Sequence, residues 1–329
     1  MTCTNEILVR INMDCAHRGM ELLTPGGSLC WENIRFDFNP EEGGHADFAV
    51  VLGNARPRDS CMVAPENTLF IAGEPLSKKL YPQAFYRQFG SVVDSHAESH
   101  HPHLFISALG LNWHVGLDRS SNSYRYGYDH LVALTCPEKQ NRISVVCSDA
   151  SKTEGQRKRL LLLEGLKQKL GNRLIHFGRG FEPINDKMDA ILPNRFHLVL
   201  ENSVLPNYWT EKLADAYLGW AYPVYLGCPN IGDYLPEDSL LSINGFDIGA
   251  IASRIESLLD QPLAPHREAA MLEARHRILN VYNPFAWATY WTKRLYQPGY
   301  AEKVVTLRSH KAFRSFLRGY WFRMRHALA

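Results

Sequence analysis

The sequence predicts an α/β fold of two domains. Its 329 residues are long for one compact core and suit two domains of ordinary size. Short apolar runs alternate with loops and with helix-length segments, a pattern typical of parallel strands joined by helices. The polar segment 135–142 contains a proline and interrupts this pattern, so we place the domain boundary there.

In the first half, apolar runs predict strands at 7–11, 47–52, 68–72 and 88–94. The strand at 68–72 ends at Gly73-Glu74-Pro75. Because ligands of open α/β sheets bind at the carboxyl ends of strands, Glu74 is a candidate for chemistry. The alternative is a glutamate that caps a turn.

The second half shows the same alternation. Apolar runs predict strands at 142–147, 174–178, 196–200, 222–226 and 239–243. Helical periodicity predicts helices at 156–170, 210–220, 248–260, 264–279 and 283–295. We expect the last of these helices to return to the first domain.

The segment 196–226 organises the second half, because its helix begins with an unusual charge. Thr210 is a good N-cap and Glu211 suits the first turn, but the cation Lys212 opposes the helix dipole there. A helix N-terminus that carries a lysine is suited to binding phosphate. The alternative is a surface helix with a solvated lysine.

Other cations precede this segment. Arg157, Lys158 and Arg159 lie in the first turns of the helix at 156–170, where they indicate either an anionic partner or a solvated basic face. Lys187 could contact a base or a phosphate, or it could be a surface lysine. We prefer the surface interpretation.

Charge and composition narrow the class of protein. The net charge is +2, but residues 303–329 carry seven basic residues and no acidic one, so the rest of the chain is at −5. A mildly acidic body argues against binding of nucleic acid. The first 13 residues resemble neither a signal peptide nor a membrane anchor. Seven scattered cysteines suit a reducing, cytoplasmic compartment, with Cys147 and Cys136 as buried thiols.

The segment 311–326 is amphipathic, with aromatic residues on one face and arginines on the other. This pattern predicts peripheral contact with a membrane, which would place the protein at the inner face of the membrane. The alternative is that the apolar face docks on the enzyme's own body.

Four histidines, His96, His100, His101 and His103, form a cluster that has no recognised metal-ligand spacing. We therefore predict no metal site there.

One motif resembles a known family. It consists of Glu201-Asn202-Ser203, then Tyr208-x-Thr210-Glu211-Lys212, then Pro223-x-x-x-Gly227. This combination is similar to the donor-binding signature of glycosyltransferase family 10, the α-1,3/1,4-fucosyltransferases, in their bacterial form. The similarity extends over residues 144–247 and returns weakly at Gly73-Glu74-Pro75.

The resemblance implies the GT-B architecture, in which two Rossmann-like domains face a cleft. The acceptor-side domain would be 1–136, the donor-binding domain 137–300 and the basic amphipathic tail 301–329. It also implies inverting transfer of L-fucose from GDP-fucose to a hydroxyl of a glycan acceptor, with no cofactor required.

The resemblance assigns roles to single residues. Glu74 would be the catalytic base that takes the acceptor proton. The donor would be bound by Arg159, Asn202, Tyr208, Glu211 and Lys212. Lys212 and Arg159 would meet the diphosphate, and Glu211 the ribose hydroxyls. Arg157 competes with Arg159, and Glu201 would either orient a cation or approach the sugar.

The chain contains no Asp-x-Asp motif that would hold a metal ion on the diphosphate, so these basic groups must meet its charge. The first half matches the family poorly, and Trp209 stands where smaller residues are usual. The alternatives are a glycosyltransferase with another nucleotide-sugar donor and a catalytically silent protein that binds a glycan or a nucleotide sugar. A bacterial surface polysaccharide or lipopolysaccharide is the expected acceptor.

Overall fold

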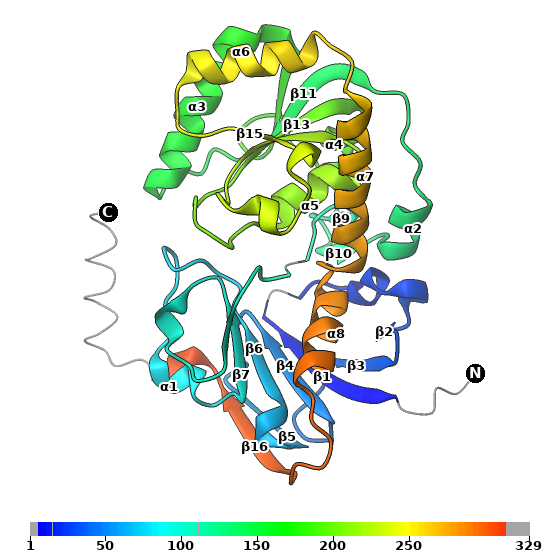
Figure 1. Ribbon diagram of the computed structural model, residues 1–329, viewed down its shortest axis with the longest axis vertical. Helices are drawn as coiled ribbons and strands as arrows, with labels where there is room; N and C mark the ends of the chain where they lie inside the picture. Colours follow the sequence, from blue (N-terminus) through cyan, green and yellow to red (C-terminus); the bar gives the residue numbers. More distant parts are fainter. Residues whose placement is uncertain (1–5, 15, 111, 314–329) are drawn as a thin grey trace. The chain divides into compact units, whose positions relative to one another are not determined.

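The structure, a computed structural model of the chain, describes residues 6–14, 16–110 and 112–313 (Figure 1). These residues form two compact units. Unit 1 comprises the described residues of 1–16, 27–109 and 285–329, and unit 2 those of 17–26 and 110–284. Each unit is built on its own, mainly parallel sheet, so the predicted α/β fold is confirmed.

Unit 1 contains a seven-stranded sheet in the order β2-β3-β1-β4-β6-β7-β8. Its neighbouring strands are parallel except for β2 and β3. The strands are β1 (Ile7–Met13), β2 (Cys30–Trp31), β3 (Ile34–Phe38), β4 (Phe48–Leu52), β6 (Thr68–Ile71), β7 (Ser91–Asp94) and β8 (Leu104–Ile106). An antiparallel ribbon pairs β5 (Arg58–Val63) with β16 (Lys303–Arg308). The helices are α1 (Gln83–Tyr86) and α8 (Pro284–Leu295).

The central strands of unit 1 are buried along their whole length. Every residue of β4, β6 and β7 is buried. Strands buried on both faces have continuous rather than alternating apolar sequences, which is why the strands at 7–11, 47–52, 68–72 and 88–94 were predictable. All four are confirmed, as β1, β4, β6 and β7. Strand β3 and the ribbon of β5 and β16 were not predicted.

Unit 2 contains a five-stranded parallel sheet in the order β12-β11-β13-β14-β15. Its strands are β11 (Gln140–Val146), β12 (Leu174–Phe177), β13 (Asn194–Leu200), β14 (Tyr222–Leu226) and β15 (Leu241–Ser242). A small hairpin consists of β9 (Leu117–Asp118) and β10 (Ser123–Tyr124). The helices are α2 (Tyr128–Ala133), α3 (Glu154–Leu170), α4 (Lys187–Ile191), α5 (Glu211–Leu218), α6 (Ile248–Leu259) and α7 (Pro265–Asn280).

The strand order of unit 2 locates a binding edge. In chain order the strands stand 2-1-3-4-5, so the direction of the connections reverses between β11 and β13. Ligands of doubly wound sheets bind beyond the carboxyl ends of the strands at such a reversal. The chain leaves β11 at Cys147 and β13 at Glu201.

Several helices of unit 2 begin at side-chain caps. Thr153 and Gln156 form a reciprocal capping box at the start of α3, and Thr210 and Asp247 cap α5 and α6. These caps explain why the predicted helices appear at the expected places. Short 3-10 helices occupy Met20–Leu23, Pro25–Gly27, Pro65–Asn67, Ala97–Ser99, Gly171–Arg173, Ile231–Asp233, Glu237–Ser239 and His310–Phe313.

The two units divide the chain differently from the predicted domain limits. Residues 110–136 belong to unit 2, because polar bonds tie them to its helices. Tyr128 Oη donates to Asn280 Oδ1 at 2.7 Å, and the Arg275 guanidinium donates to the Leu131 carbonyl. From Phe285 onwards the described chain belongs to unit 1, as expected for the last helix.

Within the described ranges, no helix has the length and apolar character needed to cross a membrane. The predicted amphipathic segment 311–326 lies outside the described residues except for 311–313. Cys147 is buried as predicted, but Cys136 is exposed and the prediction for it is wrong. Cys136 lies in the polar segment before β11, where no strand or helix covers it.

Candidate functional site

The predicted motif residues gather at the carboxyl end of β13. Glu201 directly follows this strand, and its carboxylate accepts bonds from the Thr210 backbone N–H at 2.9 Å and from the Thr210 hydroxyl at 2.7 Å. The Thr210 hydroxyl in turn caps α5 by accepting from the Lys212 backbone N–H. The Glu201 carboxylate therefore fixes the start of α5 to the end of β13.

Lys212 lies between two carboxylates. Its Nζ is 3.1 Å from Glu201 Oε2 and 3.3 Å from Glu211 Oε1. Burial lowers the pKa of Lys212, but Glu201 and Glu211 more than offset this effect and the pKa is raised. Burial alone would raise the pKa of Glu211, but Lys212, His114 and Lys187 together lower it well below its usual value. Lys212 is therefore charged at neutral pH, and so is Glu211.

Arg159 supplies a second cation next to the motif. It is 7% exposed, and its Nη1 donates to Asn202 Oδ1 at 2.7 Å. The first turn of α3 packs against the same loop, because a Cβ on Gly155 would lie 2.4 Å from the Asn202 carbonyl oxygen. The Nε of Arg159 has no hydrogen-bond partner among the described residues, so the guanidinium has a donor to spare.

Arg157 lies apart from this group. It is exposed and donates to the carbonyls of Ser151 and Lys152. The structure thus brings Arg159 rather than Arg157 to Asn202.

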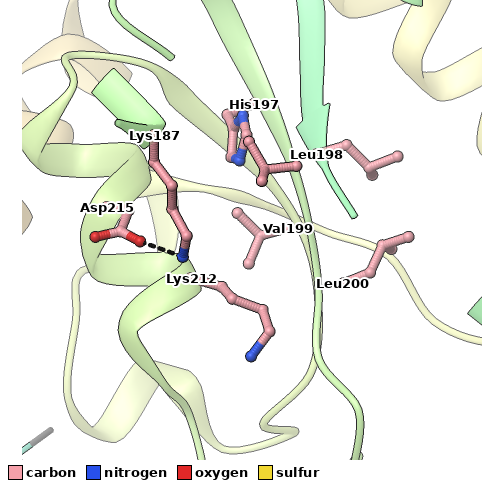
Figure 2. Close-up of a pocket in the computed structure, with 8 residues that line it drawn as sticks. Lys187, His197, Leu198, Val199, Leu200, Lys212 and Asp215 are labelled. Carbon is pink, nitrogen blue, oxygen red and sulfur yellow. Dashed lines mark hydrogen bonds and ion pairs between the residues drawn. The ribbon is translucent and has the colours of Figure 1, made fainter. Parts of the chain in front are cut away.

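The surface interpretation of Lys187 is wrong. Lys187 begins α4, is 6% exposed, and its Nζ is 2.6 Å from Asp215 Oδ2 and 3.8 Å from Glu211 Oε1. Its burial could not be foreseen because its partner, Asp215, is distant in sequence and reaches it from α5. Figure 2 shows this ion pair beside Lys212.

The two lysines line one small pocket. Its walls are formed by Val146, Lys187, His197, Leu198, Val199, Leu200, Lys212 and Asp215 (Figure 2). It has room for about one water molecule. Burial and the nearby Lys187 lower the pKa of His197 to about 3, so this wall of the pocket carries no positive charge at neutral pH.

Tyr208 is 7% exposed and close enough to Lys212 to influence its pKa. All five predicted donor residues belong to unit 2, namely Arg159, Asn202, Tyr208, Glu211 and Lys212. Trp209 is also buried, and its ring packs edge-on against Tyr282 with the centroids 5.1 Å apart.

Two further residues of this site escaped the sequence analysis. Asp215 lies one helical turn after Glu211, and that spacing was a signal for a second carboxylate on the same face. His114 lies 3.9 Å from Glu211 through its Nδ1. No local pattern pointed to His114, because the segment around it precedes the small hairpin and is irregular.

Glu74 lies in unit 1, after the end of β6. A Cβ on Gly73 would lie 2.9 Å from the Cα of Gly53, so only glycine lets the ends of β4 and β6 approach this closely. The Glu74 carboxylate is 31% exposed and forms an ion pair with Lys78. It is therefore accessible at the carboxyl edge of the sheet.

Histidines of this cluster form hydrogen bonds with nearby backbone groups. His96 accepts from the Glu98 N–H through Nδ1, and the His101 Nε2 lies 3.0 Å from the Phe89 carbonyl. In the part of the chain that the structure describes, no group of three His, Cys, Asp or Glu residues could hold a metal ion.

Comparisons with known proteins agree with the motif. Residues 137–264 match the family described as "Glycosyltransferase family 10 (fucosyltransferase) C-term". The 4-galactosyl-N-acetylglucosaminide 3-alpha-L-fucosyltransferase 9 of Rattus norvegicus is 30% identical over 138 residues, which cover 39% of this chain and 38% of that protein. The human 3-galactosyl-N-acetylglucosaminide 4-alpha-L-fucosyltransferase FUT3 is 29% identical over 143 residues, 42% of this chain and 38% of that protein.

A crystal structure of an alpha1,3-fucosyltransferase with GDP is similar with a TM-score of 0.49 and 16% identity, covering 84% of each chain. The chain matches less than two fifths of the length of these curated relatives. The matched region nevertheless contains the whole cluster from Arg159 to Lys212. Residues 137–264 are thus similar to the C-terminal part of glycosyltransferase family 10, the fucosyltransferases.

Proposed function

We propose that this protein is an inverting fucosyltransferase that moves L-fucose from GDP-fucose to a hydroxyl of a glycan acceptor. One observation carries the proposal. Within the segment that matches the family, the buried Arg159, the partly buried Lys212 and a helix N-terminus lie at the strand-order reversal of unit 2. This is a suitable place for the diphosphate of a nucleotide sugar.

The donor would be held mainly by charge. Lys212 and Arg159 would meet the diphosphate, near the positive end of the α5 dipole. Glu211 is ionised and 19% exposed, so it can accept hydrogen bonds from the ribose hydroxyls. Asn202 and Tyr208 would contact the donor beside these groups.

Of the two roles expected for Glu201, the structural one fits its contacts. It is buried, and both of its oxygens are engaged by Thr210 and Lys212. It would therefore orient Lys212 toward the phosphates rather than approach the sugar.

The proposed reaction is a single in-line displacement. An acceptor hydroxyl attacks the anomeric carbon of fucose while Glu74 takes its proton. The new bond joins the acceptor oxygen to the anomeric carbon, the bond from that carbon to the phosphate oxygen breaks, and the configuration inverts. Lys212 and Arg159 would stabilise the charge that develops on the leaving GDP.

The acceptor is proposed from the acceptors for which the relatives are named. The two mammalian relatives are named for transfer to galactosyl-N-acetylglucosaminides, so an acceptor glycan with a free hydroxyl is expected here. We propose a bacterial surface polysaccharide or lipopolysaccharide, glycosylated at the inner face of the membrane. The basic segment 311–326 would supply the membrane contact.

The second candidate is a glycosyltransferase with a different donor, or a silent protein that only binds the nucleotide sugar. It is favoured by one observation, namely that the family match at residues 137–264 lies wholly within unit 2 and leaves out unit 1. Unit 1 contains Glu74, the proposed base.

Calorimetric titration with GDP-fucose, GDP-mannose and UDP-galactose, in the presence of chelator, separates these functions. We expect selective binding of GDP-fucose without added metal. Preference for another donor would support the second candidate. Binding of GDP-fucose without transfer to any glycan, in the wild type and in Glu74→Gln alike, would identify a silent binding protein.

A further inference from the structure

His114 lies at the edge of the candidate donor site, outside the family motif. Its Nδ1 is 3.9 Å from Glu211 Oε1, and its side chain is 30% exposed. The ring also stands edge-on to His17, with the centroids 6.0 Å apart. The Nδ1 edge of the imidazole therefore lies near the Glu211 carboxylate, and part of the side chain is accessible to solvent.

The backbone around His114 is fastened to the helices of unit 2. The N–H groups of His114 and Val115 donate to Asp215 Oδ1 at 2.7 and 3.0 Å, and the next N–H, of Gly116, donates to Asp186 Oδ1 at 3.0 Å. Both carboxylates are buried. Because Asp215 belongs to the same helix as Glu211, these bonds hold the imidazole at a fixed place beside the Glu211 carboxylate.

We propose that His114 hydrogen-bonds the ribose of the bound nucleoside diphosphate and shares the sugar hydroxyls with Glu211. The inference rests on the proposed function, in which Glu211 accepts bonds from those hydroxyls. A hydroxyl bonded to Glu211 lies about 2.7 Å from the carboxylate oxygen. A ring nitrogen 3.9 Å from the same oxygen is then within reach of that hydroxyl or of its neighbour.

The chemistry of the imidazole suits a neutral hydroxyl. Burial, with a smaller contribution from Lys187, lowers the pKa of His114 to about 4, although Glu211 and Asp215 act to raise it. The ring is therefore uncharged at neutral pH and adds nothing to the attraction for phosphate. A neutral imidazole has one donor and one acceptor, and a ribose hydroxyl that donates its proton to Glu211 can accept from the imidazole N–H.

The test compares GDP with 2′-deoxy-GDP and 3′-deoxy-GDP by calorimetric titration at pH 7.5. We expect His114→Ala to weaken GDP about tenfold, the loss of about one hydrogen bond. The same substitution should leave the affinity for one deoxy analogue unchanged, because that analogue already lacks the hydroxyl in question. The control is His266→Ala, since His266 is exposed on α7 and should have no effect on any of the three ligands.

Two more variants separate hydrogen bonding from packing. His114→Phe keeps a ring and should behave like His114→Ala, whereas His114→Asn keeps polar groups and should recover part of the affinity. Thermal unfolding checks that each variant is folded, and the Phe and Asn variants carry the test if the Ala variant is not.

Three results would overturn the inference. They are GDP affinity unchanged in His114→Ala, an equal loss for GDP and both analogues, or wild-type affinity in His114→Phe. If the wild type binds GDP and Lys212→Ala abolishes that binding, such a result removes only the role of His114. If the wild type binds no GDP, the proposed function and this inference fall together.

Discussion

Removing the cation of Lys212 tests the centre of the site. Lys212→Ala deletes the partner of Glu201, whose side chain is fully buried, and of Glu211. We expect two effects. The diphosphate loses a cation that would face it, and the Glu201 carboxylate is left in the protein interior without a compensating charge.

The size of both effects follows from the geometry. Unit charges 3.1 Å apart attract by about 5 kcal/mol at an effective dielectric constant of about 20. Lys212 is 21% exposed, so solvent screening and desolvation reduce the net coupling with Glu201 to about 2 kcal/mol. Loss of the phosphate contact should cost a further 2–5 kcal/mol of donor binding, about 30-fold to several thousandfold in Kd.

The assay is a double-mutant cycle of Lys212→Ala and Glu201→Gln, measured by calorimetric unfolding and by titration with GDP. A loss of about 2 kcal/mol corresponds to a fall of about 4–8 °C in Tm for a unit of this size. We expect Lys212→Ala to show this fall and the double variant to recover part of it, because no unpaired carboxylate remains. GDP binding should be lost in both.

The matched control is Lys169→Ala, which removes an exposed lysine from α3 and should change neither quantity. Wild-type Tm and wild-type GDP affinity in Lys212→Ala would refute the reasoning. Strictly additive effects in the cycle would show that the two side chains are not coupled.

Three other substitutions have definite expected outcomes. Glu74→Gln should lower kcat by about a hundredfold or more and leave the affinity for GDP-fucose within about twofold, as expected for a general base; unchanged turnover would exclude Glu74 from that role. Arg159→Ala should weaken GDP by about tenfold or more, whereas Arg157→Ala, on the exposed side of the same helix, should change it less than about twofold; similar losses would contradict the assignment. His197 is buried with its pKa lowered to about 3, so the unfolded state binds a proton that the folded state does not. The free energy of unfolding of the wild type relative to His197→Gln should therefore fall by up to about 1.4 kcal/mol per pH unit below pH 6.5 and stay constant above pH 7.5; chemical unfolding from pH 4.5 to 8 measures this difference, and a constant difference would show that His197 is not the cause.

Local features of the sequence predicted most of unit 2. The apolar run at 196–200 and the cap at Thr210 depend on neighbours within a few residues, and both appear where expected. The proximity of Glu201 and Lys212 was also predictable, because both residues belong to the motif.

Features that depend on distant partners were not predictable. Lys187 appeared to be a surface residue because its partner, Asp215, is contributed by another helix. The start of unit 2 was predicted too late in the chain for the same reason. The backbone N–H groups of His114 and Gly116 donate to Asp215 and Asp186, which are distant in sequence. The ribbon of β5 and β16 joins residues that no short window could relate.

That ribbon has a consequence for the synthesis of the protein. Unit 1 is discontinuous, because β5 (Arg58–Val63) is made early whereas its partner β16 (Lys303–Arg308) is made near the end of translation. All residues of unit 2 leave the ribosome before β16 does, so unit 2 is free to fold while β5 still lacks its partner. During that interval β5 presents an unpaired edge, the kind of surface that recruits other chains. A released chain truncated before residue 303 would therefore aggregate more readily than one that retains β16.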